Sequence, residues 1–278
     1  MDKKLNFEDS VKYLINGITS DKPFAAGKIG VNELKCVYEY VNKFWNAETL
    51  KALYLKNGIF PSNDEMTNVF IKEFVKSIPN IDALPLWSPF NIQFEEYFIN
   101  TVNKNCTFIE VRSLESYYSD EPWTEYLENK KVLIISPFID SIQKQYNKKE
   151  LIWKDQRILP NFELKTLKHQ FSPGLGIPSK YSSWIEMITD LKKQISLIDF
   201  DIALIGTGGS SLPLVSYCKK IGKKAIHLGG SLQILFGIKG HRWDSKPHVS
   251  HFYNEHWVRP SGDEIPLDFK KHEDGCYW

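Results

Sequence analysis

In the second half of the chain, short apolar runs alternate with stretches of helical periodicity, and two of the runs end in glycine-rich turns. The first turn lies in DIALIGTGGSSLPL and the second in KAIHLGGSLQIL. This alternation is typical of a parallel sheet whose strands are joined by crossover helices. We therefore predict an α/β fold with a Rossmann-like, mostly parallel sheet.

Hydrophobic periodicity predicts the individual elements. Strands are expected at 132–135, 162–167, 202–205 and 224–228, and helices around 142–146 and at 184–198, 212–221 and 232–236. Residues 1–130 are expected to be rich in helix, at 6–18, from 31 for over three turns, at 64–77 and at 94–102, with a short extended piece at 23–29 and a loop at 79–89. No repeat or low-complexity linker separates the halves. We therefore expect a single domain over 1–278, with a helix-rich part at 1–130 and a βαβ part at 131–278.

The charge balance restricts the partners. Thirty-five Lys and Arg residues against 34 Asp and Glu leave a formal charge of +1, so no global field favours nucleic acid, and an anion site must be local. The opening residues include acidic side chains, unlike a signal peptide, and no apolar run approaches the ~18 residues that span a bilayer. The four cysteines show no CxxC spacing. We expect a cytosolic protein with reduced thiols.

The first glycine-rich turn is the sharpest candidate site. It contains Gly206, Thr207, Gly208, Gly209 and Ser210. Backbone amides in such a turn, together with the helix start that follows, suit the diphosphate of a nucleotide. The turn lacks the third glycine of GxGxxG and the lysine of a P-loop. A tight turn with a serine as helix cap is therefore an equally weighted alternative.

The second turn follows the next predicted strand, where His227 precedes Gly229 and Gly230. Ligands of open α/β sheets bind beyond the carboxyl ends of the strands, so both turns should face one crevice. His227 is a candidate general base or hydrogen-bond donor to a phosphate, and a buried histidine bonded to the backbone is the alternative. Gln233 would read a sugar or base edge, or face water.

The C-terminal part holds two of the four arginines beside tryptophans. The candidate donor-binding residues there are His241, Arg242, Trp243, Asn254, Trp257 and Arg259. A guanidinium group pairs with phosphate, and an indole ring offers a face to a sugar or base. The alternative is that these side chains stack on one another and fasten the tail to the sheet.

Near the N-terminus, PFAAGKIGVNEL places Lys28 and Gly30 before a helix that carries Glu33 in its first turn. A carboxylate there would take a proton from an acceptor hydroxyl or bind a metal. A structural role is the alternative, because an acidic residue in the first turn stabilises a helix.

Two of these segments resemble a known family. FAAGKIGVNEL resembles the R-[FI]-G-x-x-E motif of glycosyltransferases with the GT-D fold. The run 201–278 resembles the C-terminal part of a GT-D-like family of bacterial surface-polysaccharide proteins, through IALIGTGGSSLPL, HLGG-x-x-Q-x-LFGIKG-x-RW, WVRP and a closing CYW. The residues between about 45 and 184 are placed only by continuity.

The resemblance implies transfer of a sugar from a nucleotide-sugar donor to a glycan or lipid-linked glycan acceptor, in capsule or O-antigen biosynthesis. It also implies peripheral contact with the inner face of the membrane, where lipid-linked acceptors reside. Lys28 stands where the family has arginine, and Glu33 stands at its glutamate, so Glu33 and His227 are the candidate bases.

The resemblance bears on metal as well. Family members with an Asp-x-Glu pair would bind Mn²⁺ or Mg²⁺, but Val31 occupies the first position of that pair here. The motif is incomplete, and we assign no metal ligand. Lys28, Arg242, Arg259 and helix N-termini would balance the charge of the diphosphate instead.

Two other classes of function are open. A nicotinamide-dependent oxidoreductase would use the GTGG turn, but the following strand ends in HLG and not in the acidic residue that binds ribose. A non-catalytic protein of a polysaccharide assembly complex would bind a nucleotide sugar or glycan in the same crevice, because a fold does not determine chemistry.

Overall fold

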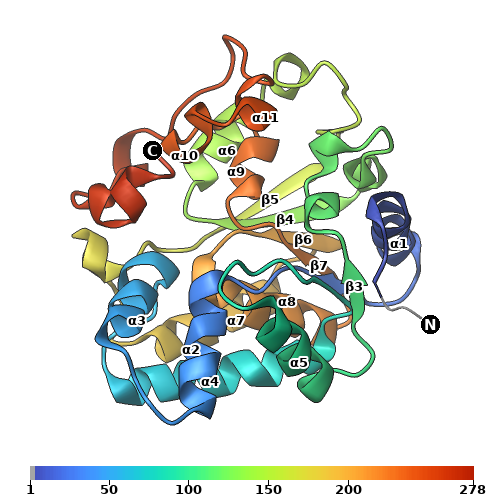
Figure 1. Cartoon of the computed structure of the whole chain (residues 1–278). Coiled ribbons are helices and arrows are strands. Elements are labelled where there is room, and N and C mark those ends of the chain that lie inside the picture. Colours follow the sequence, from blue (N-terminus) through green and yellow to red (C-terminus); the bar gives the residue numbers. More distant parts are fainter. Residues whose placement is uncertain (1–3) are drawn as a thin grey trace.

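The computed structural model describes residues 4–278, which form a seven-stranded sheet with every neighbouring pair parallel (Figure 1). Its strands are β1 Ala25–Ala26, β2 Ala83–Pro85, β3 Thr107–Ile109, β4 Lys131–Ser136, β5 Glu163–Lys168, β6 Ile202–Ile205 and β7 Lys224–His227. The strand order is β3-β2-β1-β7-β6-β4-β5. The pairing of β1 with β7 joins the two halves of the chain in one sheet. The predicted α/β class is confirmed.

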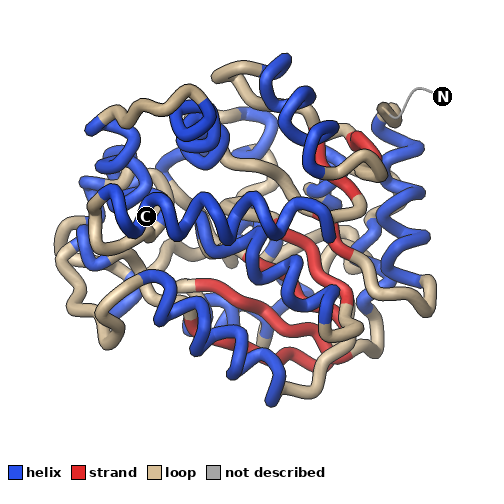
Figure 2. The backbone as a smooth tube through the Cα atoms, turned by 90° about the horizontal axis from the view of Figure 1, so that it is seen from below, coloured by secondary structure: helices blue, strands red, loops and turns tan. Residues whose placement is uncertain are grey.

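Helices cover both faces of the sheet. They are α1 Phe7–Thr19, α2 Val31–Val41, α3 Ala47–Ala52, α4 Asp64–Ser77, α5 Ile92–Val102, α6 Ile139–Tyr146, α7 Trp184–Leu197, α8 Ser211–Lys220, α9 Ser231–Leu235, α10 His241–Asp244 and α11 Pro247–Ser250. In Figure 1, α2, α4, α5, α7 and α8 lie below the sheet, and α6 and α9–α11 lie above it. Figure 2 shows the lower layer from beneath, with helices lying across the strands.

The strand side chains alternate between two cores. In β4, Val132 and Ile134 belong to the core shared with α1, α6 and α9, whereas Leu133 and Ile135 belong to the core shared with α2, α4, α7 and α8. All four side chains are fully buried. A strand covered on both faces is therefore apolar throughout, which explains the continuous run in the sequence.

Several helices begin at a side-chain cap. The capping residues are Asn6 of α1, Asn63 of α4, Asn91 of α5 and Ser183 of α7, each of which accepts a backbone N–H from the first turn. Each cap stabilises its helix by about 1 kcal/mol. The caps fix the starting points that the periodicity predicted.

The N-terminal half departs from prediction. The segment 79–89, expected as a loop, contains β2, and β3 was not predicted. Both strands are three residues long and β1 has two, too short for a period of two to be recognised. The helix from Val31 ends at Val41, and α3 with the π-helical turn η1 Leu53–Asn57 follows it.

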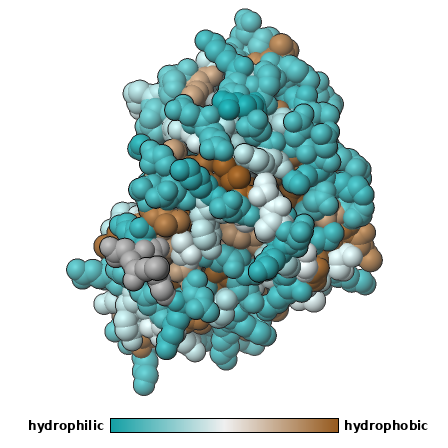
Figure 3. Space-filling view, turned by 90° about the vertical axis from the view of Figure 1, so that its right-hand side faces the viewer, coloured by the Kyte–Doolittle hydropathy of each residue, from teal (hydrophilic) through white to brown (hydrophobic). Residues whose placement is uncertain are grey.

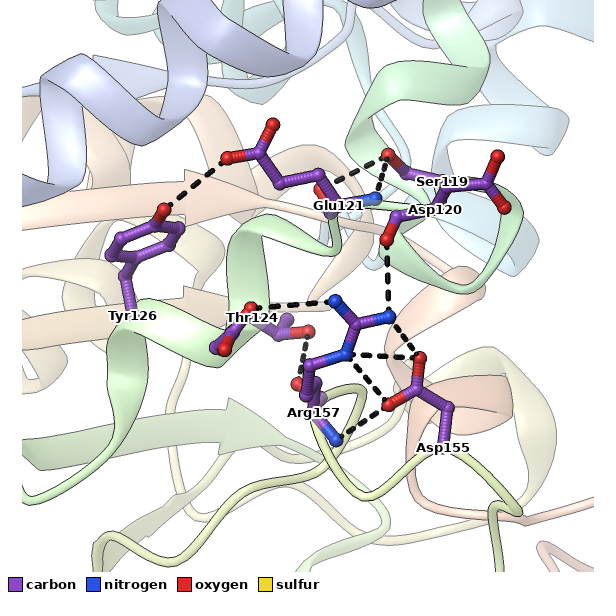
Figure 4. Close-up of polar contacts among 8 residues, drawn as sticks. Ser119, Asp120, Glu121, Thr124, Tyr126, Asp155 and Arg157 are labelled. Atoms are coloured by element: carbon purple, nitrogen blue, oxygen red, sulfur yellow. Dashed lines mark hydrogen bonds and ion pairs between the residues drawn. The ribbon is translucent and has the colours of Figure 1, made fainter.

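Arg157 fastens the long connection between β3 and β4. Its guanidinium Nη2 donates to Asp155 Oδ2 over 2.7 Å and to the Asp120 carbonyl over 3.1 Å, and its own carbonyl accepts from Thr124 over 3.3 Å (Figure 4). These contacts tie the 3₁₀ turn η5 Trp123–Leu127 to the loop after α6. Arg157 therefore has a structural role.

The surface on the side shown in Figure 3 is mainly hydrophilic, with small apolar areas between the polar side chains. Among the helices formed by residues 4–278, none combines the length and the apolar character that crossing a bilayer requires.

Candidate active site

A cavity of about 530 Å³ lies at the carboxyl ends of the strands. Its lining includes Lys28 and Gly30 after β1, Trp87 after β2, Ser136 at the end of β4, His169 after β5, Gly206 after β6, and His227 at the end of β7. The π-helical turn η1 and the C-terminal tail, residues 262–278, complete its walls. Because the strands are parallel, their loops converge at one edge, which is where α/β proteins bind ligands.

The connections of the sheet diverge beside this cavity. β4 leads outward to the edge strand β5, whereas β6 leads the other way to β7. The Gly206 N–H donates to the Ile135 carbonyl over 2.9 Å, so the β6 turn starts directly beside β4. Such a switch point leaves a crevice that no connecting helix covers.

The two glycine-rich turns lie against each other. A Cβ atom added to Gly206 would lie 2.8 Å from the Gly229 carbonyl oxygen, so only glycine fits there. Gly208 and Gly229 have φ of +58° and +60°, in the left-handed region that glycine adopts at little cost. The structure thus brings both predicted turns to one crevice.

Ser210 and Gly209 lie behind the cavity wall. The buried Ser210 hydroxyl accepts from Trp184 Nε1 over 2.9 Å and lies 3.1 Å from His169 Nε2. Gly209 packs against Ile59 and Phe70. The turn therefore presents Gly206, Thr207 and Gly208 to the cavity, and Ser210 has a structural role in place of the predicted diphosphate contact.

Lys28 and Arg242 supply positive charge to the cavity. Lys28 Nζ lies 3.9 Å from Glu115 Oε1 and 5.6 Å from the centre of the Trp87 ring. Burial lowers the pKa of Lys28, Glu115 opposes that shift, and Arg242 adds to it. The neighbouring cations therefore repel each other, and an anionic ligand would relieve the repulsion.

Glu33 is buried in the first turn of α2, with its carboxyl group folded over Gly30. Burial raises its pKa, while its own backbone N–H and the Asn57 side chain oppose the shift. Asn57 Oδ1 in turn accepts from Asn32 Nδ2 over 3.0 Å. A buried carboxyl with a raised pKa is suited to accept a proton near neutral pH.

His227 is bonded to the backbone, as the alternative for this residue foresaw. Its Nδ1 lies 3.1 Å from the Ile205 carbonyl oxygen and 3.2 Å from the Gly229 nitrogen. Burial lowers its pKa to about 4, against the effect of the Ile205 bond. An imidazole with this pKa is a weak base at neutral pH, so Glu33 is the better candidate.

Gln233 borders the cavity, but its side-chain amide is hydrogen-bonded to other groups of the protein. Its Nε2 donates to the carbonyl groups of Lys239 and Tyr277 over 3.1 and 2.7 Å, and its Oε1 is buried without a partner. Its amide thus holds the C-terminal tail against α9.

Other predicted donor-binding residues lie outside the cavity lining. Asn254 Nδ2 donates to the Leu151 and Ile152 carbonyl groups, and Trp257 Nε1 donates to that of Ile152. Arg259 donates to Asp244 over 2.6 Å and to the Trp278 carbonyl over 3.1 Å. For these residues the tail-fastening alternative describes the geometry.

The first three residues of α10 lie in different surroundings. His241 is 72% exposed and lies 3.6 Å from Asp244, away from the cavity lining. Trp243 packs against Gly230 and Gly240 beneath the tail. Of this segment only Arg242 lines the cavity.

Several lining residues were not predicted from the sequence. They are Lys56 and Asn57 of η1, His169 and Ser172 after β5, and His272, Glu273 and Tyr277 of the tail. The Asn57-Gly58 pair signals a turn, but nothing in the sequence places that turn against Gly208, where the Asn57 carbonyl lies.

The paired carboxylates of a divalent metal site are missing at Glu33, whose side-chain partner is the amide of Asn57. Across residues 4–278, no group of three or more His, Cys, Asp or Glu side chains is arranged to hold a metal ion. Because the residues around Glu33 do not fit such a site, we derive no step through a metal.

Comparison with known proteins supports the architecture. No protein-family model and no curated protein matches the chain. A solved structure does match. It is a selenomethionine-substituted structure of domain of unknown function 1792 (DUF1792), with a TM-score of 0.50 and 12% sequence identity, over 94% of this chain and 92% of that one. The likeness to DUF1792 shows a shared fold across nearly the whole of both chains.

Proposed function

We propose that the protein is a glycosyltransferase that uses a nucleotide-sugar donor. One observation carries the proposal: Lys28, Arg242 and the glycine turns of β6 and β7 border one cavity at the carboxyl edge of the sheet. The backbone of a glycine turn beside two cations suits a diphosphate. The resemblance of FAAGKIGVNEL and of 201–278 to GT-D-like glycosyltransferases supports a sugar as the transferred group.

In this proposal each lining group has a chemical role. The amide of Gly208 and the side chains of Lys28 and Arg242 bind the diphosphate, whereas the amides of Gly206 and Thr207 donate to the Ile135 carbonyl and the Ser211 hydroxyl. When the bond between sugar and diphosphate breaks, the leaving group gains negative charge, which the two cations stabilise. Glu33 accepts the proton of the acceptor hydroxyl as that oxygen bonds to the sugar.

The acceptor and the location are part of the same proposal. We propose a glycan or lipid-linked glycan of a capsule or O-antigen as the acceptor, and a cytoplasmic protein that contacts the inner face of the membrane. These details rest on the resemblance. The single-domain organisation stays a prediction, and we assign no metal ligand.

Two measurements test the proposal. Thermal unfolding is followed with nucleoside diphosphates and their sugars, with and without Mn²⁺, because a ligand that binds only the folded state raises the melting temperature. Donors that bind are then assayed for hydrolysis and transfer with wild type and Glu33→Gln. We expect Glu33→Gln to retain donor binding and to lose at least about 100-fold in turnover. No shift with any diphosphate would refute the proposal.

Non-catalytic binding of a nucleotide sugar is the second candidate. It is favoured by the contacts of Glu33, which bonds to its own helix N-terminus and to Asn57, and by the low pKa of His227. Donor binding with neither hydrolysis nor transfer, in wild type supplied with cell extract as acceptor source, would support this candidate.

A further inference from the structure

The carboxylate of Glu273 links two cations that come from different segments of the cavity lining. It forms an ion pair with Arg242 of α10, and its Oε1 lies 3.4 Å from Lys56 Nζ of η1. All three residues line the cavity. In Figure 1 the tail that carries Glu273 faces α3 and the turn after it. Glu273 thus connects the C-terminal tail to η1, which lies more than 200 residues earlier in the sequence.

The backbone at this point adopts a conformation that L-residues seldom take. Glu273 and the following Asp274 have φ of 47° and 54°. Two successive non-glycine residues in the left-handed region are unfavourable. The neighbouring chain holds them there, since Arg242 N–H donates to the Cys276 carbonyl over 2.9 Å and His241 N–H to that of Trp278 over 3.0 Å.

The charged groups that line the cavity indicate what the Glu273 carboxylate does. The lining contains the cations of Lys28, Lys56 and Arg242 and the carboxyl groups of Glu33 and Glu273. Glu33 is directed to the start of α2. Burial alone would raise the pKa of Glu273, but Arg242 and Lys56 hold it below its usual value. Glu273 is therefore the carboxylate that binds Lys56 and Arg242, whereas Lys28 lies beside Glu115.

We propose that Glu273 occupies the place of a ligand phosphate, and that a bound diphosphate displaces it and takes Lys56 and Arg242 as partners. This inference rests on the proposed function and adds Lys56 to the residues that bind the donor. A ligand must compete with a carboxylate already seated between two cations, so its charge decides the outcome. Glu273 would thus favour diphosphates over monophosphates.

Calorimetric titration of the full chain with pyrophosphate, a nucleoside diphosphate and the matching monophosphate tests the inference. Glu273→Gln keeps the size of the side chain and removes its charge. We expect it to bind pyrophosphate and the diphosphate about 3- to 10-fold more tightly than wild type, and to discriminate less against the monophosphate. Glu273→Ala should act in the same direction, and Lys56→Met should weaken diphosphate binding.

Asp268→Asn is the matched control. Asp268 lies in the same tail, pairs with Lys271 over 2.7 Å and is not part of the cavity lining, so the change in net charge is equal and binding should stay at the wild-type level. Damage to the fold weakens binding, so a gain in affinity separates the two effects. Unchanged or weaker binding by Glu273→Gln, with wild type still binding diphosphates, overturns this inference alone. Failure of every variant and of wild type to bind overturns the proposed function as well.

Discussion

The Arg242 guanidinium lies over the Tyr277 ring, 4.8 Å from its centre, and Nη1 is 3.3 Å from the Tyr277 hydroxyl. The ring holds the guanidinium at the cavity wall, where it also meets Glu273. Arg259, from the same C-terminal part of the chain, donates instead to Asp244 and to the last carbonyl group. Two arginines that the sequence presents as equivalent therefore have different roles.

Substitution of the two arginines should separate these roles. We expect Arg242→Met to weaken nucleoside diphosphate binding by about 10-fold or more, because it removes a charge-assisted contact. Arg259→Met should leave affinity within about 2-fold and lower the free energy of unfolding by about 0.5–1 kcal/mol, as for a partly exposed ion pair. Titration calorimetry and urea denaturation of both variants measure the two effects. Equal losses of affinity would contradict the division.

We expect Lys28 to strengthen diphosphate binding without stabilising the fold. Its ammonium group is held in a site where burial lowers its pKa, so the site disfavours the charged form, and its ion pair with Glu115 is long, at 3.9 Å. Residues that serve binding often cost stability in this way. We expect Lys28→Met to unfold at the same or a higher temperature than wild type without ligand, and to lose about 10-fold or more in diphosphate affinity.

Lys219→Met provides the control for Lys28→Met. Lys219 Nζ pairs with Asp82 over 2.6 Å, away from the cavity lining. Its loss should lower stability slightly and leave diphosphate affinity unchanged. A marked drop in the melting temperature of Lys28→Met would show that its contact with Glu115 is structural.

Three buried histidines should make stability depend on pH. Burial lowers the pKa of His169, His227 and His272 to about 4, whereas histidines of the unfolded chain titrate near 6.5. The unfolded state therefore binds more protons between these values. The stabilisation is complete above pH 6.5 and is lost as pH falls towards 4, by at most about 3 kcal/mol for each histidine.

Urea denaturation at a series of pH values from 7 to 4 measures this loss. His169→Gln should flatten the slope between pH 6.5 and 4, because one group that protonates on unfolding is gone. His241→Gln is the control, since His241 is largely exposed and its replacement removes no buried group. A wild-type slope in His169→Gln would mean that His169 is already charged in the folded state.

The strands that sequence predicted are those long enough to show a pattern. β4 and β6 each contain a continuous apolar run of four residues, at 132–135 and 202–205, and Gly206 follows the β6 run. β2 and β3 are too short to show a sequence pattern, and they are strands because they pair with their neighbours in the sheet. Their pairing joins segments far apart in the chain, which local periodicity does not record.

The candidate site was predictable to the same extent. Parallel strands bring their carboxyl ends together, so both glycine turns could be placed in one crevice. The sequence does not identify which group a polar side chain binds, because a guanidinium group pairs with phosphate and with carboxylate in the same geometry. Arg259 and Asn254 were therefore misplaced, and Lys56 was missed because a π-helical turn has no periodicity of its own.

Because the two glycine turns are in close contact, we expect a side chain at Gly206 to lower the stability of the protein. An alanine Cβ there would lie 2.8 Å from the Gly229 carbonyl oxygen and 3.1 Å from Leu232 Cδ2, so the turns must separate. We expect Gly206→Ala to lower the free energy of unfolding by about 1–3 kcal/mol, as overpacking does, and to weaken diphosphate binding as well. Gly222→Ala is the comparison, because Gly222 has φ of +82° and open space around it. That variant carries only the backbone cost of about 1–2 kcal/mol for an L-residue in the left-handed region and should bind diphosphates as wild type does. If Gly206→Ala bound them equally well, the packing of the two turns would not shape the site.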